Sequence, residues 1–227
     1  MKILRAKHEI LTPISYTLTP KEVTPGVTYS EYKYGTFEMK QLERMARICY
    51  KSEGYISVGI ESAEDLIQKL IKNGHEAMLE HSSLSVIFQC DRGVSHELVR
   101  HRMASFAQES QRYCNYSKDR FGGEVTFIQP WWMDEEDDLG YSTWLKSCEE
   151  AEKTYFKMLN EGYSAQQARM VLPNCTKTEI GVTANYREWR HILRLRTASN
   201  SHPDMKFLMD GLKAELKEKL PVVFGDI

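Results

Sequence analysis

Residues 100–113, RHRMASFAQESQRY, hold the densest group of side chains in this chain that could do chemistry. Three arginines, one histidine, two serines and two glutamines lie within these fourteen positions, in a chain whose formal net charge is −2. Guanidinium groups stay charged near neutral pH and bind phosphate through paired, planar hydrogen bonds. The segment therefore predicts a local site for an anionic ligand rather than part of a broad basic surface.

A short helix is predicted to lead into this segment, from about Val94 to Arg102. At about 100° per residue, one polar arc of this helix holds His96, Glu97, Arg100 and His101. Arg102 falls on the apolar side, where a buried and unpaired charge would be costly. Either Arg102 has a bound anion or a carboxylate partner, or the helix has already ended and Arg102 lies in solvent at its frayed end.

Residues 105–113 alternate as an extended segment would, with one face formed by Phe106, Gln108, Ser110 and Arg112. Ser110 and Arg112 would then lie about 7 Å apart along the backbone. That spacing suits one phosphate held by a hydroxyl and a guanidinium. An amphipathic edge strand with a polar outer face accounts for the same alternation, so the pattern alone leaves both interpretations open.

A second basic cluster lies in residues 185–196, NYREWRHILRLR. On a helix, basic side chains would recur on one face at Arg187, Arg190, His191 and Arg194. Apolar side chains would take much of the opposite side, at Trp189, Ile192 and Leu195. Like charges at this spacing repel mildly. The cluster therefore indicates either a bound anion or pairing with acidic residues elsewhere in the chain.

Motifs of several other protein classes are absent from the sequence. There is no G-x-G, no G-x-x-x-x-G-K and no G-x-S-x-G, so a nucleotide must be held by side chains, chiefly arginines. His75 and His81 are six residues apart rather than four, which excludes the H-E-x-x-H zinc motif. No metal site is predicted, and His75, after Gly74, is interpreted as a hydrogen-bonded helix cap.

Composition and charge exclude further classes. A mildly acidic chain is unsuited to nucleic acid, because phosphate-backbone binders usually carry a broad positive excess. Five widely spaced cysteines without a C-x-x-C pair indicate reduced thiols in the cytoplasm. The charged N-terminal residues fit no signal peptide, and no apolar run approaches the ~18 residues of a membrane span. We therefore expect a cytoplasmic protein with neither nucleic acid nor a membrane as its partner.

Apolar spacing and turn residues predict the elements that position these clusters. Strands are expected at 1–11, 84–90, 124–128 and 178–183, and helices at 37–49, 62–73, 141–168, 187–196 and 205–220. A capping box at Ser62 would open the second of these helices. Residues 12–36 and the acidic run Asp134–Asp138 are predicted to be loops. One α/β or α+β domain over residues 1–227 follows, with no clear internal boundary.

The order Arg100-His101-Arg102, two residues, Ser105, four residues and Ser110-Gln111-Arg112-Tyr113 resembles the signature of the flavin-dependent thymidylate synthases. Landmarks in the same order elsewhere support the resemblance, at residues 74–76, 80–81, 168–169, 171–173, 185–187 and 195–196. They span roughly residues 37–200.

This resemblance implies a homotetramer of α/β subunits, each with a central, mainly antiparallel sheet flanked by helices, and FAD held at subunit interfaces. It also implies the reductive methylation of dUMP to dTMP in nucleotide biosynthesis. In that reaction 5,10-methylenetetrahydrofolate gives the carbon, NADPH gives electrons through the flavin, and tetrahydrofolate is released.

The resemblance also implies roles for individual residues. The expected FAD contacts are His75, Ala77, Arg100, His101, Arg102, Gln108, Asn185, Arg187 and His191. The expected dUMP contacts are Glu97, Arg100, Gln108, Glu109, Ser110, Gln111, Arg112, Arg169 and Arg196. Arg196 also matches the catalytic arginine that stabilises the ionised uracil ring.

Three positions depart from the pattern of the family. Ala107 stands where many members have Asn, and Gln108 where they have Glu. A glutamine keeps hydrogen bonding but has no carboxylate, so Gln108 is not expected to act as a general base. His191 stands where some members have Asn, and either side chain can donate a hydrogen bond.

The side chains present fit flavin chemistry better than covalent catalysis. Residues 173–176, PNCT, lack the histidine that follows the nucleophilic cysteine of the other type of thymidylate synthase, and a reduced flavin can supply hydride without a protein nucleophile. Ser110 has no evident base beside it and is assigned to substrate binding. The alternative is a non-redox nucleotide-phosphate-binding protein that uses the same arginines, and a weaker one is an RNA-binding module. The sequence leaves open the order of hydride and methylene transfer and the preference between NADPH and NADH.

Overall fold

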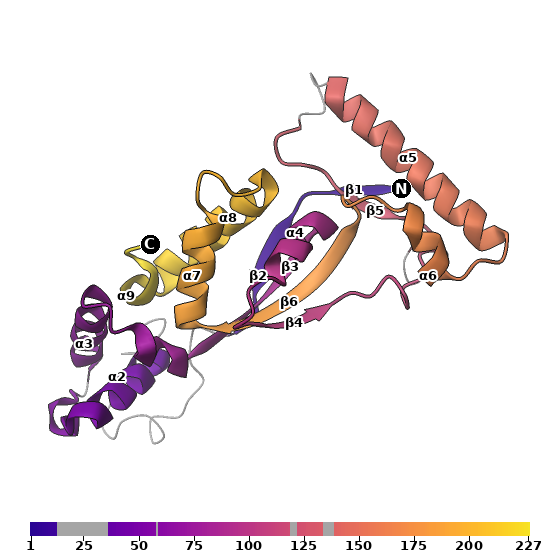
Figure 1. Ribbon diagram of the computed structural model, residues 1–227. Coiled ribbons are helices and arrows are strands. Elements are labelled where there is room, and N and C mark those ends of the chain that lie inside the picture. Colours follow the sequence, from indigo (N-terminus) through magenta and orange to yellow (C-terminus); the bar gives the residue numbers. More distant parts are fainter. Residues whose placement is uncertain (13–35, 58, 119–121, 134–138) are drawn as a thin grey trace. The chain divides into compact units, whose positions relative to one another are not determined.

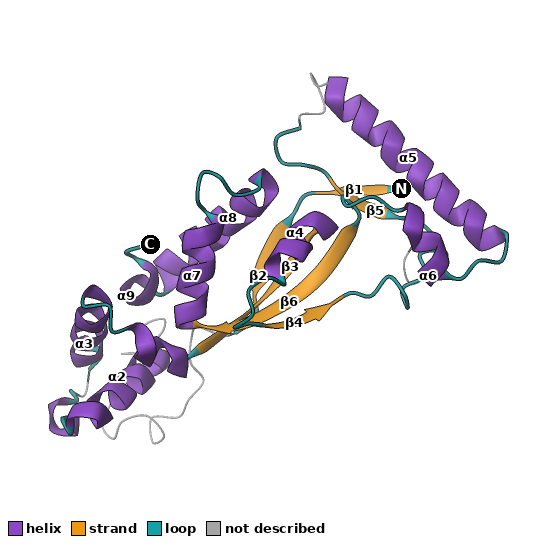
Figure 2. Cartoon of the chain, viewed as in Figure 1, coloured by secondary structure: helices purple, strands orange, loops and turns teal. Residues whose placement is uncertain are grey.

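The computed structural model describes residues 1–12, 36–57, 59–118, 122–133 and 139–227 (Figure 1). The fold is mixed α/β, with an antiparallel sheet and helices, as expected (Figure 2). The predicted loop at 12–36, apart from its two end residues, and the acidic run at 134–138 lie outside the described residues. None of the described helices combines the length and the apolar character needed to cross a membrane.

Four strands form one sheet in the order β2-β3-β6-β4. Their bounds are β2 Lys7–Ile10, β3 Ser83–Asp91, β6 Lys177–Asn185 and β4 Ser105–Gln108. The alternation of buried and exposed side chains along β3 and β6 is the period of two that predicted these strands. The strand expected at 1–11 is instead two strands, β2 and β1 (Lys2–Leu4). β1 pairs in parallel with β5 (Thr126–Ile128).

The chain folds into two compact units. The first unit consists of Met1–Glu9, Ile87–Val182 and Ser199–Leu208. The second unit consists of Ile10–Val86, Thr183–Ala198 and Met209–Ile227. The expectation of one domain over residues 1–227 stays a prediction.

The first unit contains α4 (Arg92–Leu98), α5 (Leu139–Asn160) and α6 (Ala165–Ala168), and α5 and α6 contribute to an apolar core. This core includes Tyr116, Val125, Phe127, Cys148, Tyr155 and Ala168. The single helix predicted at 141–168 is wrong, because Gly162 adopts a φ of +93°, a left-handed conformation that ends the helix. The chain re-enters a helix at α6 through a capping box between Ser164 and Gln167.

The second unit contains α2 (Thr36–Tyr50), α3 (Glu61–Lys72), α7 (Tyr186–Arg196) and α9 (Pro221–Phe224). Helix α8 (Pro203–Lys219) begins in the first unit and continues into the second. Trp189 of α7 is fully buried, and its Nε1 donates to the carbonyl oxygen of Leu84 at 2.9 Å. The described residues also form the 3₁₀ turns η2 (Glu53–Tyr55), η3 (Glu76–His81) and η5 (Arg169–Val171).

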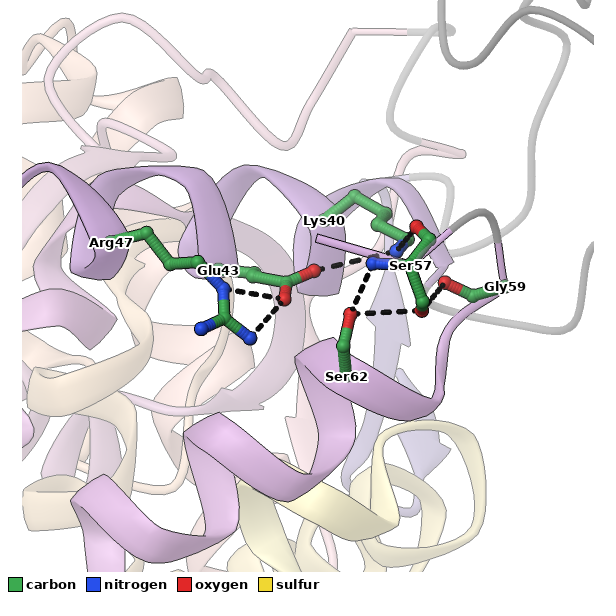
Figure 3. A network of polar contacts seen from close by, with 6 residues as sticks. All are labelled: Lys40, Glu43, Arg47, Ser57, Gly59 and Ser62. Carbon is green, nitrogen blue, oxygen red and sulfur yellow. Dashed lines mark hydrogen bonds and ion pairs between the residues drawn. The ribbon is translucent and has the colours of Figure 1, made fainter. Parts of the chain in front are cut away.

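Helix α3 does not begin with the predicted capping box. The N-cap residue is Ile60, which has no side-chain oxygen, and α3 begins at Glu61. The hydroxyl of Ser62 instead accepts a hydrogen bond from the backbone N of Ser57 at 3.0 Å and contacts the Ser57 hydroxyl at 2.9 Å (Figure 3). The preceding turn therefore uses the Ser62 oxygen that the prediction gave to the helix.

A buried carboxylate lies beside this turn. Glu43 is fully buried, and its carboxylate oxygens lie 3.3 Å from Lys40 Nζ and 2.8 Å from Arg47 Nη2 (Figure 3). Two cations offset the cost of removing one carboxylate from water. The pairing is internal to α2 and holds that helix and the Ser57 turn together, because Lys40 Nζ also donates to the carbonyl oxygen of Ser57 at 2.8 Å.

Candidate functional site

The expected site residues divide between the two units. Those of the first unit are Glu97, Arg100, His101, Arg102, Gln108, Glu109, Ser110, Gln111, Arg112 and Arg169. Those of the second unit are His75, Ala77, Asn185, Arg187, His191 and Arg196. The two sets are described separately.

Helix α4 ends at Leu98, four residues before the predicted end at Arg102. Its start is fixed by Asp91, whose Oδ1 accepts from the backbone N of Val94 at 2.8 Å. Arg100 and Arg102 follow the helix, are exposed, and within the described residues their guanidinium groups contact no carboxylate. The structure therefore supports the interpretation of Arg102 as a solvated residue beyond the helix end, while His101 beside it is buried.

Gln108, the last residue of β4, joins three elements of the first unit. Its Nε2 donates to Ser95 Oγ on α4 at 2.9 Å and to Thr178 Oγ1 on β6 at 3.2 Å. Both hydroxyls are buried. The amide therefore fixes the end of β4 against its neighbours, a role that a carboxylate could fill only by accepting these bonds.

The extended segment predicted to reach residue 113 ends at Gln108, and a turn follows. The carbonyl oxygen of Ser110 accepts from the backbone N of Tyr113 at 3.1 Å and of Cys114 at 2.9 Å, and Ser110 Oγ accepts from the N of Arg112 at 3.3 Å. Serine favours such local bonds over a strand ladder. Ser110, Gln111 and Arg112 therefore share one turn rather than one face of a strand.

Arg112 is held at the surface of this turn. Its Nε donates to Gln166 Oε1 at 3.2 Å, and its guanidinium lies 5.5 Å from the centre of the Tyr113 ring. Neither contact compensates its charge. Arg169 opens η5, is half-buried, and has no side-chain partner among the described residues. Both arginines are thus positioned without a carboxylate partner in the described part of the first unit.

Lys177 is a residue of this region that the sequence reasoning missed. Its Nζ lies 3.1 Å from Glu109 Oε2 and 2.9 Å from Glu179 Oε1. Burial lowers the pKa of Lys177, but the hydrogen bond to Glu179 and the charge of Glu109 outweigh burial and place that pKa above its ordinary value. The spacing of Lys177 and Glu179, two residues apart on one face of a strand, was the signal available in the sequence.

In the second unit, Asn185 caps α7. Its Oδ1 accepts from the backbone N of Glu188 at 2.9 Å, so its amide nitrogen remains as the donor. Burial raises the pKa of Glu188, and the charge of His191 opposes the shift. Exposed His191 and half-buried Arg196 lie further along the same helix.

His75 and Ala77 lie at the start of η3. His75 occupies the N-cap position of η3, but its side chain makes no capping hydrogen bond, so the predicted cap is wrong. Its backbone N donates to the carbonyl oxygen of Leu70 instead, at 2.8 Å. Both residues are exposed.

Arg187, Arg190 and Arg194 of α7 pair with carboxylates, which is one of the two alternatives that the sequence left open for this cluster. Arg190 is fully buried, with Nη2 at 3.1 Å from Glu76 Oε1 and Nη1 at 2.6 Å from Asp226 Oδ1. Arg194 Nη2 lies 3.3 Å from Glu76 Oε1, and Arg187 Nη1 lies 2.5 Å from Glu80 Oε1. The hydrogen bond from Arg190 also lowers the pKa of Asp226.

The predicted polar and apolar faces of α7 are partly wrong. Arg190 is buried, whereas Leu195, assigned to the apolar side, is 47% exposed. Glu76 and Asp226 are distant in sequence and bring the compensating charge to Arg190. Helical spacing alone carries no information on such partners.

Comparison with known proteins identifies the relatives of this chain. The family model described as "Thymidylate synthase complementing protein" matches residues 35–222, a range that contains every expected site residue. The flavin-dependent thymidylate synthase of Corynebacterium aurimucosum is 32% identical over 213 residues, which cover 86% of this chain and 83% of that protein. The chain belongs to the flavin-dependent thymidylate synthase family.

Other matches agree with this family. The flavin-dependent thymidylate synthase of Geobacter sulfurreducens is 33% identical over 190 residues, covering 80% of this chain and 78% of that protein. The crystal structure of a UMP/dUMP methylase, PolB from Streptomyces cacaoi bound with 5-Br UMP, superposes with a TM-score of 0.71 at 19% identity. It covers 99% of this chain and 95% of its own, and at this identity it shows that this member of the flavin-dependent thymidylate synthase family shares its fold.

Proposed function

We propose that this protein catalyses the reductive methylation of dUMP to dTMP in the cytoplasm as a homotetramer. FAD is its cofactor, 5,10-methylenetetrahydrofolate its carbon donor and NADPH its reductant, with tetrahydrofolate released. The observation that carries the proposal is membership of the flavin-dependent thymidylate synthase family over residues 35–222. The location, assembly and co-substrates rest on the resemblance described above.

The exposed donors fit the phosphates of FAD. Arg100 and Arg102 are exposed and lack a carboxylate partner among the described residues, so their charge is available to an anion. In the second unit Asn185 keeps an amide donor and Arg187 is half-exposed, at 53%. His75, Ala77, His101, Gln108 and His191 complete the proposed contacts. Bound FAD would supply the hydride that the pyrimidine ring receives.

The turn at Ser110 suits the phosphate of dUMP. Its hydroxyl accepts from Arg112 N and keeps a proton to donate, while Arg112 uses only Nε on Gln166. Arg169 adds a second guanidinium. Glu97, Arg100, Gln108, Glu109, Gln111 and Arg196 complete the proposed substrate contacts. Arg196 would stabilise negative charge that develops on the uracil ring, which is usually a large electrostatic contribution.

An anaerobic visible spectrum tests this proposal. The purified protein is reconstituted with FAD, and NADPH is added before and after dUMP. We expect the flavin band to bleach, and to return only when dUMP and methylenetetrahydrofolate are both present. A colourless protein that takes up no FAD would overturn the proposal and leave a non-redox nucleotide-phosphate-binding protein.

A further inference from the structure

Glu109 lies inside the segment proposed to bind dUMP, yet all its polar groups are used within the first unit. Its backbone N donates to the carbonyl oxygen of Glu179 at 2.9 Å, and its own carbonyl oxygen accepts from Arg92 Nη1 at 3.4 Å. Its carboxylate accepts from Lys177 Nζ at 3.1 Å and from the Tyr116 hydroxyl at 3.4 Å. The side chain therefore anchors the segment within the first unit.

Lys177 is the charged centre of this anchor. Its side chain is 19% exposed and that of Glu109 16%, so the pair is screened less than a surface pair. Lys177 comes from β6, whereas Glu109 is the residue between the end of β4 and the Ser110 turn. The ion pair thus fixes the point at which the backbone leaves the sheet and enters the turn.

We propose that Lys177 is a positioning residue for nucleotide binding, acting through Glu109 on the turn of Ser110 and Arg112. The proposal rests on the proposed function, because it assigns the ligand of that turn as dUMP. Without the ammonium group, Glu109 and Glu179 would lose their shared cation. The ion pair would then no longer hold the residue at the start of the turn to β6. Two uncompensated carboxylates beside a phosphate site would also repel the ligand.

Positioning of the turn and repulsion of the phosphate predict opposite changes in dUMP affinity for Glu109→Gln. If Glu109 mattered only as a negative charge near the phosphate, its neutralisation would tighten dUMP binding. If Glu109 holds the turn through Lys177, the same change loosens the turn and weakens binding. The sign of this one change therefore separates positioning from simple repulsion.

The test measures the dUMP dissociation constant of the FAD-reconstituted protein by calorimetry, together with flavin content and unfolding temperature. The variants are Glu109→Gln, Lys177→Met, the double variant and Lys177→Arg. Lys153→Met is the matched control, because Lys153 pairs with Glu150 on α5 with both side chains largely exposed. We expect Lys177→Met and Glu109→Gln each to weaken dUMP binding about tenfold, with the double variant little worse than either. Lys177→Arg should restore most of the affinity.

Flavin content should stay close to that of Lys153→Met in every variant, because a misfolded fraction would lose flavin together with dUMP affinity. The unfolding temperature of Lys177→Met should fall, because Glu109 and Glu179 lose their cation, whereas that of Glu109→Gln should stay close to that of Lys153→Met. Tighter binding by Glu109→Gln, or unchanged binding in every variant, would overturn the inference. If Lys177→Met does not fold, the dUMP dissociation constant of the near-isosteric variant Glu109→Gln tests the inference instead. A wild-type protein that binds no dUMP would overturn the proposed function and this inference with it, whereas unaffected variants of a binding wild type overturn the inference alone.

Discussion

The two units each hold a group of arginines that look alike in sequence and differ in their partners. In the second unit, Arg187, Arg190 and Arg194 all contact carboxylates. In the described part of the first unit, Arg100 and Arg102 contact none. An arginine already paired with a carboxylate has little net attraction left for an anion, whereas an unpaired one keeps it.

The backbones that present these arginines are closely similar. Strand β3 ends at Asp91, which caps α4, and strand β6 ends at Asn185, which caps α7. Both caps have extended backbones, with φ/ψ of −76°/166° and −72°/166°. The difference in role therefore lies in the acidic side chains that reach each cluster, not in the local fold that carries it.

The largest expected effect on stability comes from replacing Arg190. Arg190→Met should lower the free energy of unfolding by about 1–3 kcal/mol, because the buried guanidinium loses its charged hydrogen bonds and leaves Glu76 and Asp226 with only Arg194 beside them. Urea unfolding followed by circular dichroism measures the change. A loss no greater than that of the exposed control Lys153→Met would mean that Arg190 is not structural.

The opposite result is expected for Arg102. Arg102→Ala should change the free energy of unfolding by less than about 0.5 kcal/mol, because the side chain is exposed and makes no described contact. FAD affinity should fall by about 10- to 100-fold, the value of a hydrogen bond to a charged group. Flavin fluorescence titration measures this loss. Equal flavin affinity in variant and wild type would remove Arg102 from the proposed cofactor site.

A smaller change in folding stability is expected when the pH is lowered. The hydrogen bond from Arg190 lowers the pKa of Asp226 in the folded protein. The pair therefore stabilises the fold above the unfolded pKa of about 3.9, and this contribution disappears as pH falls through the lower folded pKa. Asp226 is 49% exposed, so the contribution should be below about 1 kcal/mol. Urea unfolding at about pH 6 should show Asp226→Asn as less stable than wild type, with the two converging near pH 2; parallel curves at both pH values would contradict this.

The smallest effect concerns Arg187, which belongs to the paired group but is also a proposed FAD contact. Glu80→Gln removes a partner that is 44% exposed and should change stability by less than about 0.5 kcal/mol. Because the change frees Arg187 for an anion, FAD affinity should rise slightly or stay constant. A clear fall in flavin affinity, measured beside Arg102→Ala, would show that Glu80 itself supports the cofactor.

Periodicity predicted the long elements of this fold well. Strands β3 and β6 and helices α2, α7 and α8 lie where apolar spacing placed them, because burial on one face sets both the spacing and the structure. The early end of α4, the turn at Ser110 and the break at Gly162 were missed. Each depends on a backbone hydrogen bond or a φ value, which the pattern of apolar residues does not encode.

The residues of the candidate site were predicted from a sequence motif, and a motif does not identify contacts between residues that are distant in the chain. It named Glu109 as a substrate contact, a role that stays untested beside the contacts that this side chain makes within the first unit. It did not name Lys177, whose pairing with Glu109 joins positions 68 residues apart. Likewise, the burial of Arg190 depends on Glu76 and Asp226. Contacts between distant residues are the part that spacing along the chain could not supply.

The burial of Trp189 has a consequence for optical measurements on this protein. The chain has four tryptophans. Trp189 is fully buried in the second unit, whereas Trp131 and Trp132 of the first unit are 48% and 45% exposed. A shift of emission to longer wavelength on unfolding will therefore come mainly from Trp189 and from half-buried Trp144, which packs against the apolar core of the first unit. Comparing wild type with Trp189→Phe would isolate the emission of the second unit, which contains the paired arginines.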